Sequence, residues 1–388
     1  MFLPPALSTR RHEYGAPARK LAKSAGAGSC LPYAQGMRKK GTKLLSGVVP
    51  DLGTGASELA LIRQIRQRAA GQPGRVQLGI GDDCALLRIR PGEEVAVTTD
   101  LSIDGRHFRL DWHPAESVGH RTLARGLSDI AAMGARPVGA FLSLGLPREL
   151  AKEGGRTGAR AGNWIDRFFD GLLALAAVHD TVLAGGDLAE SPLAVADVVL
   201  VGAVPRGRAL LRSGALPGDD LYVTGTLGGA AAGLARLAAS TQNARGKGRG
   251  ITAALEAELA AHLRPQPRVQ QGLWLQRRRM ASAAIDVSDG LSTDLAHLCE
   301  ESGVGAEVDA ELLPVHSGAT KVQALHGGED YELLFTATEG TRIPDAIAGV
   351  AVTKIGRMVR RRTGRAQITI ISGREKSSLT TRGWEHFS

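Results

Sequence analysis

Apolar and polar residues are regularly patterned from Ser57 onward, whereas the first 55 residues show no such periodicity. Ser57 can cap a helix in which Leu59, Ile62 and Ile65 recur with helical spacing. Beyond it, short apolar runs bounded by glycine or proline alternate with longer amphipathic stretches, which is typical of strands alternating with helices. The elements expected in the first half are strands at 84–89, 94–99, 138–146, 181–184 and 194–204, and helices at 114–133 and about 163–179.

The alternation resumes after a basic, proline-containing stretch at 205–218, where we place a domain boundary. The elements expected beyond it are strands at 221–224, 283–285, 304–308, 330–336 and 351–356, an alanine-rich helix after the turn at 225–229, two helices up to about 280, and a helix from Leu291. The pattern predicts an α/β protein of the mixed α+β type. Its predicted parts are a disordered basic extension (1–55), an N-terminal domain (56–205) and a C-terminal domain (206–388).

The net charge of +9 is concentrated at one end of the chain. Residues 1–43 contain nine Arg and Lys residues against one acidic residue, Glu13, so the rest of the chain is nearly neutral. A specific nucleic-acid partner is therefore not expected for the folded part. The basic segment is an upstream extension with Met37 as initiator, a targeting peptide, or a flexible arm, and it lacks the apolar stretch of a secretory signal.

Membrane insertion and disulfide bonding are not expected either. No apolar run reaches the roughly 18 to 20 residues that a membrane-spanning helix needs. Cys30, Cys84 and Cys299 are isolated in the sequence, which argues against a disulfide framework or a thiolate zinc site and suits a reducing compartment. We expect a cytoplasmic protein.

Aspartate recurs where the apolar strands are predicted to end. The four segments with this pattern are Gly81-Asp82-Asp83, Thr98-Thr99-Asp100, Gly185-Gly186-Asp187 and Asp286-Val287-Ser288-Asp289-Gly290. A fifth aspartate, Asp129, lies late in the helix at 114–133 between apolar neighbours. Taken singly, each is more often a turn former or a helix cap than a ligand. However, two carboxylates about 4 Å apart repel by roughly 4 kcal/mol at an effective dielectric near 20, so a converging set would need a cation or a proton.

An oxygen-only site favours Mg²⁺ or Mn²⁺ over Zn²⁺, and magnesium sites of this kind commonly bind substrate phosphates. The pattern therefore points to phosphoryl transfer. The chain contains no G-x-x-x-x-G-K-[ST], H-R-D or D-F-G motif, so it is neither a Walker nucleotide binder nor a protein kinase. ATP phosphates would be held mainly by metal ions, with Arg212, Ser288 and the amides of the glycine turns as supporting donors.

Seven motifs together resemble the thiamine-monophosphate kinase family in both order and spacing. They are Gly79 to Ala85, Thr98-Thr99-Asp100 followed by His107, Leu127 to Gly134, Gly185-Gly186-Asp187, Arg208 to Gly214, Asp286 to Gly290, and Gly327 to Glu332. The resemblance covers residues 57–388. It implies the two-domain fold of the aminoimidazole ribonucleotide synthetase (PurM-like) superfamily, with an N-terminal mixed sheet that has helices on one face and a C-terminal α/β domain.

The resemblance also implies a role for individual residues. Several Mg²⁺ ions would be held by Asp83, Thr98, Thr99, Asp100, Asp129, Asp187, Asp286 and Asp289, of which Asp83, Asp129 and Asp289 would act in catalysis. ATP would contact Gly186, Asp187, Arg212 and Ser288, and thiamine monophosphate would contact His107, Glu329 and Trp384. Without the resemblance, the last three would be interpreted as a strand-end histidine, a strand cap and a hydrophobic anchor.

The implied reaction transfers the γ-phosphoryl group of ATP in line to the phosphate of thiamine monophosphate, giving thiamine diphosphate. A phosphate oxygen needs no general base at neutral pH, so positioning and charge neutralisation would carry the catalysis. The family also implies a homodimer built from strands of the first domain. Two features depart from its pattern: Leu188 stands where a small hydroxyl residue is usual, and the segment 310–326 is shortened.

Other members of the superfamily fit less well. A selenophosphate synthetase would need a reactive Cys or selenocysteine near a glycine-rich N-terminus, and a hydrogenase-maturation protein would end in cysteine, whereas this chain ends in Ser388. Aminoimidazole and formylglycinamidine enzymes remain alternatives, but the run at 327–332 and the Trp384-Glu385-His386-Phe387 ending favour the thiamine enzyme. From a different class, an RNA-binding protein tethered by its basic tail is the other alternative.

Overall fold

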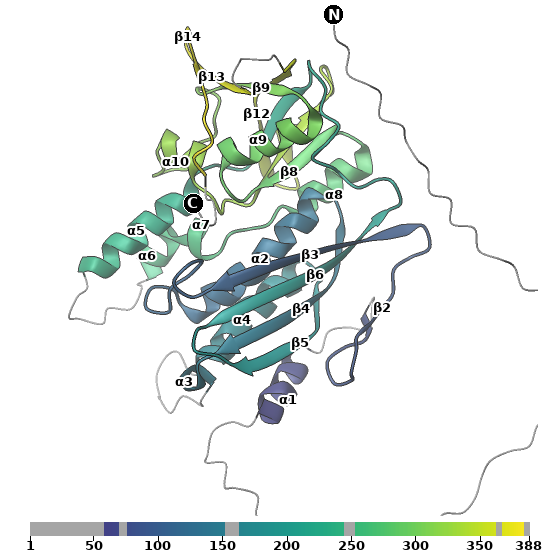
Figure 1. Cartoon of the computed structure of the whole chain (residues 1–388), viewed down its shortest axis with the longest axis vertical. Coiled ribbons are helices and arrows are strands. Elements are labelled where there is room, and N and C mark those ends of the chain that lie inside the picture. The colour runs from purple at the N-terminus through teal and green to yellow at the C-terminus, as the bar shows by residue number, and fades with distance from the viewer. Residues whose placement is uncertain (1–57, 70–75, 152–162, 244–252, 362–366, 384–388) are drawn as a thin grey trace, which may run out of the picture. The chain divides into compact units, whose positions relative to one another are not determined.

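The computed structural model describes residues 58–69, 76–151, 163–243, 253–361 and 367–383 (Figure 1). The helices are α1 (Glu58–Ala69), α2 (Ala115–Ala132), α3 (Arg148–Ala151), α4 (Trp164–Val178), α5 (Gly229–Asn243), α6 (Ala253–Glu258), α7 (Ala260–Leu263), α8 (Val269–Arg278), α9 (Leu291–Ser302) and α10 (Lys321–His326). The strands are β1 (Val76–Leu78), β2 (Leu86–Leu87), β3 (Glu93–Ile103), β4 (Arg136–Leu146), β5 (Val182–Glu190), β6 (Val195–Pro205), β7 (Asp220–Thr224), β8 (Ala283–Val287), β9 (Gly305–Asp309), β10 (Glu332–Ala337), β11 (Ala346–Ile347), β12 (Val350–Val359), β13 (Ile368–Ser372) and β14 (Glu375–Ser378).

The first sheet has four strands in the order β3-β6-β4-β5. It is mixed, because β4 and β5 are parallel while the other neighbours are antiparallel. Buried residues on one face of the strands, such as Leu142 and Val198, share a core with Leu127 of α2 and Phe168 of α4. Figure 1 shows these two helices behind the sheet. The predicted mixed sheet with helices on one face is therefore confirmed.

The second sheet is formed by eight strands in the order β14-β13-β9-β12-β7-β10-β8, with β11 paired to β12. Successive residues of β10 point to opposite faces, as in any strand. Leu334 packs into a core with Leu291 and Leu295 of α9, whereas Leu333 and Phe335 join the core that contains α2. The helix α2 is thus packed between the two sheets.

Helix α2 forms where the sequence predicts it, beginning after Pro114 and ending before Met133. Nearly all of its residues are buried, which suits its position between the sheets. It packs very closely on α4, because a Cβ atom at Gly119 would overlap the backbone carbonyl of Phe168, and one at Gly171 would overlap that of Glu116. This packing fixes the position of the first half of α2.

The expectation that aspartates end their strands is wrong for two of them. Asp100 lies within β3, which pairs with β6 along its whole length from Glu93 to Ile103. Asp187 lies within β5, which stays paired to β4 as far as Glu190. The backbone ladder continues past both side chains because neighbouring strands supply hydrogen-bond partners that the apolar pattern alone does not reveal.

Short and exposed elements were also missed or misjudged. The predicted strand at 84–89 is reduced to β2, which pairs with β1, and β13, β14 and α10 had no clear pattern in the sequence.

The predicted extension at 1–55 lies outside the described residues, and the domain boundary at 205/206 stays a prediction. None of the described helices combines the length and the apolar character that crossing a membrane requires.

Candidate active site

The predicted site residues are distributed over two cavities. The first, which we call the glycine-turn cavity, has a volume of about 750 Å³ and lies between the segment 79–85 and the strands β4 and β5. The second, the central cavity, has a volume of about 500 Å³ and lies between the two sheets, beside α2. The predicted site residues that line the central cavity are Asp100, His107, Asp129, Asp286, Ser288, Asp289 and Glu329.

Carboxylates from three elements meet at one end of the central cavity. Asp100 comes from the inner face of β3, Asp129 from α2 and Asp286 from β8. The Thr98 hydroxyl donates a hydrogen bond to Asp129, and the Ser128 hydroxyl donates one to Asp286 Oδ2 at 2.6 Å. Two adjacent residues of α2 therefore take part in the cluster: Ser128 binds the Asp286 carboxylate, and Asp129 supplies a carboxylate of its own.

Burial makes this cluster electrostatically unfavourable. Burial, followed by the neighbouring Asp129, raises the pKa of Asp286 to about 7 and that of Asp100 to about 6. The pKa of Asp129 is raised as well, mainly by burial, and the positive charge of Arg212 opposes the increase in the pKa of both Asp129 and Asp286. Arg125 Nε lies 3.5 Å from Asp100 Oδ1.

One oxygen of the cluster has no partner. Asp100 Oδ2 is buried and accepts no hydrogen bond from the described residues, a state that ordinarily costs free energy. An unpartnered carboxylate oxygen among carboxylates that raise one another's pKa fits a site for a hard cation with oxygen ligands. No group of three or more His, Cys, Asp or Glu side chains in the described parts of the chain is arranged as a ready set of metal ligands.

The predicted metal ligands line two cavities of the described chain, not one. Asp83 and Asp187 line the glycine-turn cavity, not the central one. Asp100 and Gly186 lie on one row across the first sheet, joined through Val198 and Leu142. Three strand spacings of about 4.8 Å place the two ends of this row about 14 Å apart, too far for one metal ion.

Thr99 also lies apart from the cluster. Side chains alternate along β3, so Thr98 and Asp100 face α2 while Thr99 is exposed on the opposite face. Alternation alone separates Thr99 from its two neighbours, but the sequence does not show which face of the strand meets α2. Arg212 is exposed, but its segment is held close to the cluster because Leu211 O accepts a hydrogen bond from the Ala284 amide on β8 at 2.8 Å.

The glycine-turn cavity combines acidic groups with an apolar lining. Asp82 Oδ1 accepts the Asp83 amide at 2.9 Å, so Asp82 acts as a turn former. Gly186 has a φ of +147°, and a Cβ atom there would overlap the backbone of Leu142. The apolar lining is made by Ile62, Ile65, Phe141, Phe169, Leu183 and Leu188, the last being the residue that departs from the family pattern.

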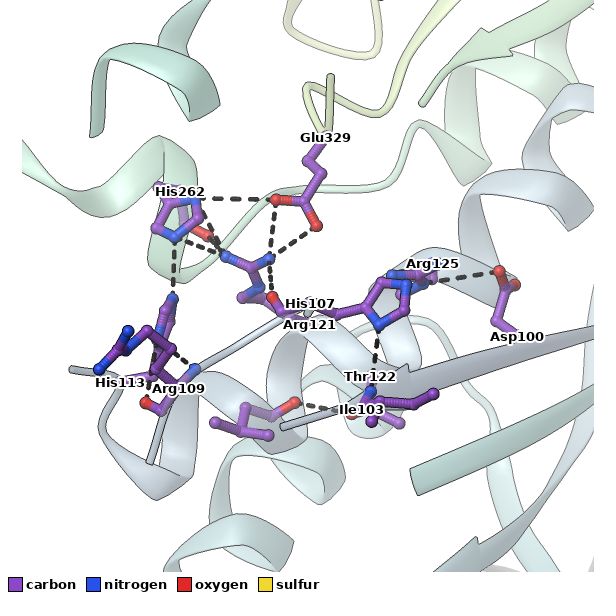
Figure 2. Close-up of polar contacts among 11 residues, drawn as sticks. Asp100, Ile103, His107, Arg109, His113, Arg121, Thr122, Arg125, His262 and Glu329 are labelled. Carbon is purple, nitrogen blue, oxygen red and sulfur yellow. Dashed lines mark hydrogen bonds and ion pairs between the residues drawn. The ribbon is translucent and has the colours of Figure 1, made fainter. Parts of the chain in front are cut away.

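The predicted substrate residues His107 and Glu329 both line the central cavity. His107 Nδ1 accepts the Ile103 amide at 3.1 Å. Glu329 lies in a turn with a φ of +67°, in which its amide donates to Ser288 O at 2.8 Å. Figure 2 shows a guanidinium, that of Arg121, between the His262 ring and the Glu329 carboxylate. Trp384 lies outside the described residues.

Several important residues were not found from the sequence. Asp294 accepts the amides of Asp289 and Gly290 at 3.0 Å each, and burial raises its pKa to about 8. Asp330 accepts the amides of Gly228 and Ala230, and burial raises its pKa to about 7.

The available sequence signals differ between these residues. An acidic residue in the first turn of the helix from Leu291 was a usable sign for Asp294. Nothing in the sequence connects Arg121 to His262 and Glu329, which are 141 and 208 residues away.

Comparison with protein families matches two consecutive models to the chain. Residues 81–204 match "AIR synthase related protein, N-terminal domain", and residues 217–367 match "AIR synthase related protein, C-terminal domain". Among curated proteins, the thiamine-monophosphate kinase of Escherichia coli K12 is 40% identical over 343 residues, which cover 85% of this chain and 98% of that kinase.

Solved structures agree with these matches. The thiamine-monophosphate kinase of Stenotrophomonas maltophilia is 39% identical, with a TM-score of 0.67 over 81% of this chain and 97% of that one. AaThiL, solved in complex with AMPPCP and TMP, is 27% identical, with a TM-score of 0.63 over 85% of this chain and 97% of that one.

Proposed function

The chain belongs to the thiamine-monophosphate kinase family, and from this premise we propose how its two cavities bring about the ATP-dependent phosphorylation of thiamine monophosphate. The protein is a kinase of thiamine diphosphate biosynthesis. The observation that carries the mechanism is the cluster of buried carboxylates at one end of the central cavity, which gathers Asp100, Asp129 and Asp286 from three elements.

The nucleotide spans the two cavities in this proposal. The apolar lining of the glycine-turn cavity suits a base, and the predicted ATP contacts Gly186 and Asp187 lie there. The other two predicted contacts, Arg212 and Ser288, belong to the central cavity or its acidic end. Binding of both AMPPCP and TMP by AaThiL supports a site for each ligand on this fold.

The central cavity holds the acceptor, with its phosphate toward the acidic end and its rings toward the walls that carry His107 and Glu329. Trp384 stays a predicted contact of the thiamine rings. The acceptor phosphate is already an anion, so no residue has to remove a proton from it. Asp83, Asp129 and Asp289 therefore act by placing charge, and the transfer is direct and in line, without a phosphoenzyme.

Negative charges of two kinds would meet at the acidic end, those of the carboxylates and those of the phosphates, so a cation is needed to offset their repulsion. The donor set fits Mg²⁺, with Asp100, Asp129, Asp286, Asp289 and Thr98 in the central cavity and Asp83 and Asp187 in the glycine-turn cavity as the residues that would hold the ions. When bound, Mg²⁺ neutralises the charge on the transferring phosphoryl group. Thr99 would contribute only through its backbone, since its side chain faces away.

A second copy of the chain completes the enzyme in this proposal. Val95, Val97 and Leu101 are 52%, 61% and 45% exposed on the outer face of β3, an edge strand of the first sheet. An apolar row on an edge strand is a surface that proteins usually cover. We place the enzyme in the cytoplasm, where ATP is supplied.

The test is an assay of purified protein with MgATP and either thiamine monophosphate, free thiamine or no acceptor. Thiamine diphosphate is expected only with the monophosphate, and activity is expected to disappear with EDTA and return with Mg²⁺. Absence of product with the monophosphate would refute the function. Trapping of a labelled phosphoprotein during turnover would refute direct transfer alone.

A further inference from the structure

Arg121 occupies an unusual position at the boundary of the central cavity. It is 6% exposed and lies in the first half of α2, away from the acidic end. Its guanidinium contacts groups from three separate segments: the loop that carries His107, the helix α7 and the turn that carries Glu329. Figure 2 shows these contacts converging on the one side chain.

A single nitrogen of Arg121 joins two segments that line the central cavity. Nη2 donates to His107 O at 3.0 Å and contacts both carboxylate oxygens of Glu329 at 2.7 and 2.8 Å. His107 belongs to the first half of the chain and Glu329 to the second. One nitrogen atom therefore contacts both of these lining segments.

The other nitrogen anchors the guanidinium itself. Nη1 donates to His262 O at 3.1 Å and lies 2.7 Å from His262 Nε2. His113 Nδ1 lies 3.1 Å from the Arg109 amide and 3.2 Å from Arg109 O, and its Nε2 lies 3.0 Å from His262 Nε2. Burial, followed by the charge of Arg121, lowers the pKa of both His113 and His262, so the two rings are neutral beside the guanidinium.

The turn at Glu329 needs such support. Glu329 and Tyr331 have φ values of +67° and +52°, a region that side-chain-bearing residues rarely adopt. Backbone bonds to Ser288 and Val287 hold this turn from one side, and Arg121 holds its carboxylate from the other. A released Glu329 would be free to turn its carboxylate away from the acceptor.

We infer that Arg121 is a positioning residue for the acceptor: it sets the distance between the His107 wall and the Glu329 carboxylate, and thereby the affinity for thiamine monophosphate. The inference rests on the proposed acceptor site. Arg121 touches neither the acidic cluster nor the glycine-turn cavity in the contacts of the described residues. Its loss therefore affects the acceptor more than ATP.

The test compares steady-state kinetics of the wild type, Arg121→Gln and Arg121→Lys. For Arg121→Gln, the KM for thiamine monophosphate is expected to rise about tenfold or more, because charge-assisted hydrogen bonds are lost, while the KM for ATP changes less than about twofold. Lysine keeps the charge but has one nitrogen where arginine has a fork, so Arg121→Lys is expected to lie between the two. An unchanged acceptor KM, or an equal rise for ATP, would overturn the inference.

The matched control is Arg136→Gln. Arg136 forms a similarly shielded pair with Glu93 at 3.0 Å but lines neither cavity, so both KM values are expected to stay at the wild-type level. If Arg121→Gln does not fold, the test uses Arg121→Lys, for which the KM for thiamine monophosphate is again expected to rise more than the KM for ATP.

A double-mutant cycle tests whether Arg121 acts through Glu329. In a Glu329→Gln background, Arg121→Gln is expected to raise the acceptor KM little further, whereas additive effects would refute the coupling. If the wild type does not phosphorylate thiamine monophosphate, the proposed function fails. The positioning role of Arg121 is then tested separately by comparing crystal structures of the wild type and Arg121→Gln. The Glu329 side chain is expected to leave its position in Arg121→Gln, and an unmoved carboxylate would contradict the positioning role.

Discussion

Asp286 is almost completely buried, and this burial is the main reason why the pKa of its carboxyl group is raised to about 7. Its pKa is higher in the folded than in the unfolded chain, so stability is lost as the pH rises from about 4 to 7 and stays reduced above that. At pH 8 without Mg²⁺, Asp286→Asn is therefore expected to melt at the same temperature as the wild type or higher. Its turnover is expected to fall at least about 100-fold, and the stabilisation by MgATP is expected to disappear.

The measurement is thermal unfolding with and without MgATP, together with turnover. Asp220→Asn is the matched control, because Asp220 is a shielded aspartate paired with Lys354 at 2.6 Å and lines neither cavity. It is expected to keep the MgATP response. An Asp286→Asn protein that is still stabilised by MgATP would exclude this carboxylate from metal binding.

His120 gives the opposite pH dependence. Its Nε2–H donates to Pro265 O at 2.8 Å, and burial lowers its pKa to about 4. The unfolded chain takes up this proton near pH 6.5 and the folded chain only near pH 4, so stability is lost as the pH falls between these values, by up to about 3 kcal/mol. His120→Gln is expected to flatten the slope of unfolding free energy against pH in this window.

Urea unfolding at a series of pH values measures that slope. Other groups also titrate in the window, so the difference between the variant and the wild type is the informative quantity. His297→Gln, at an exposed position on α9, serves as the control and is expected to keep the wild-type slope. Identical slopes for His120→Gln and the wild type would contradict a buried neutral ring at this position.

At the scale of elements, the sequence predicted those that have a long apolar pattern and missed those that do not. The helix α2 and the strand β6 were found because burial imposes a period on their side chains. The strand β14, in which every residue is exposed, carries no such pattern. The aspartates of the site were found for their residue type, but their division between two cavities follows from strand register, which the local sequence does not encode.

The contact between α2 and α4 is a further property of elements. Alanine normally favours a helix by about 1 kcal/mol over glycine, but a Cβ atom at Gly171 would overlap the Glu116 carbonyl on α2. Gly171→Ala is therefore expected to destabilise the fold by about 1 to 3 kcal/mol, since two backbones must separate. It is also expected to lower turnover, because α2 carries Asp129.

Urea unfolding and turnover measure the two effects. Val178→Ala, at the exposed end of α4, is the control and is expected to stay within about 0.5 kcal/mol of the wild type. A Gly171→Ala protein that is as stable as the wild type would mean that the two helices can separate without cost.

At the scale of the whole molecule, the core and the two cavities belong to one chain, whereas the outer face of β3 is left uncovered. Val97 is the most exposed large apolar residue of that strand. In a dimer that covers this face, an aspartate at position 97 would be buried without a partner, which costs more than the contact can supply. Val97→Asp is therefore expected to convert a dimer into a monomer at micromolar concentration.

Sedimentation equilibrium gives the mass directly. The wild type is expected at twice the mass of the chain and Val97→Asp at the mass of one chain. Val322→Asp places the same charge on an exposed valine of α10 and is expected to leave the dimer intact. A monomeric wild type, or a Val97→Asp protein that is still a dimer, would show that β3 is not the interface, because an uncompensated charge cannot remain at the centre of an apolar contact.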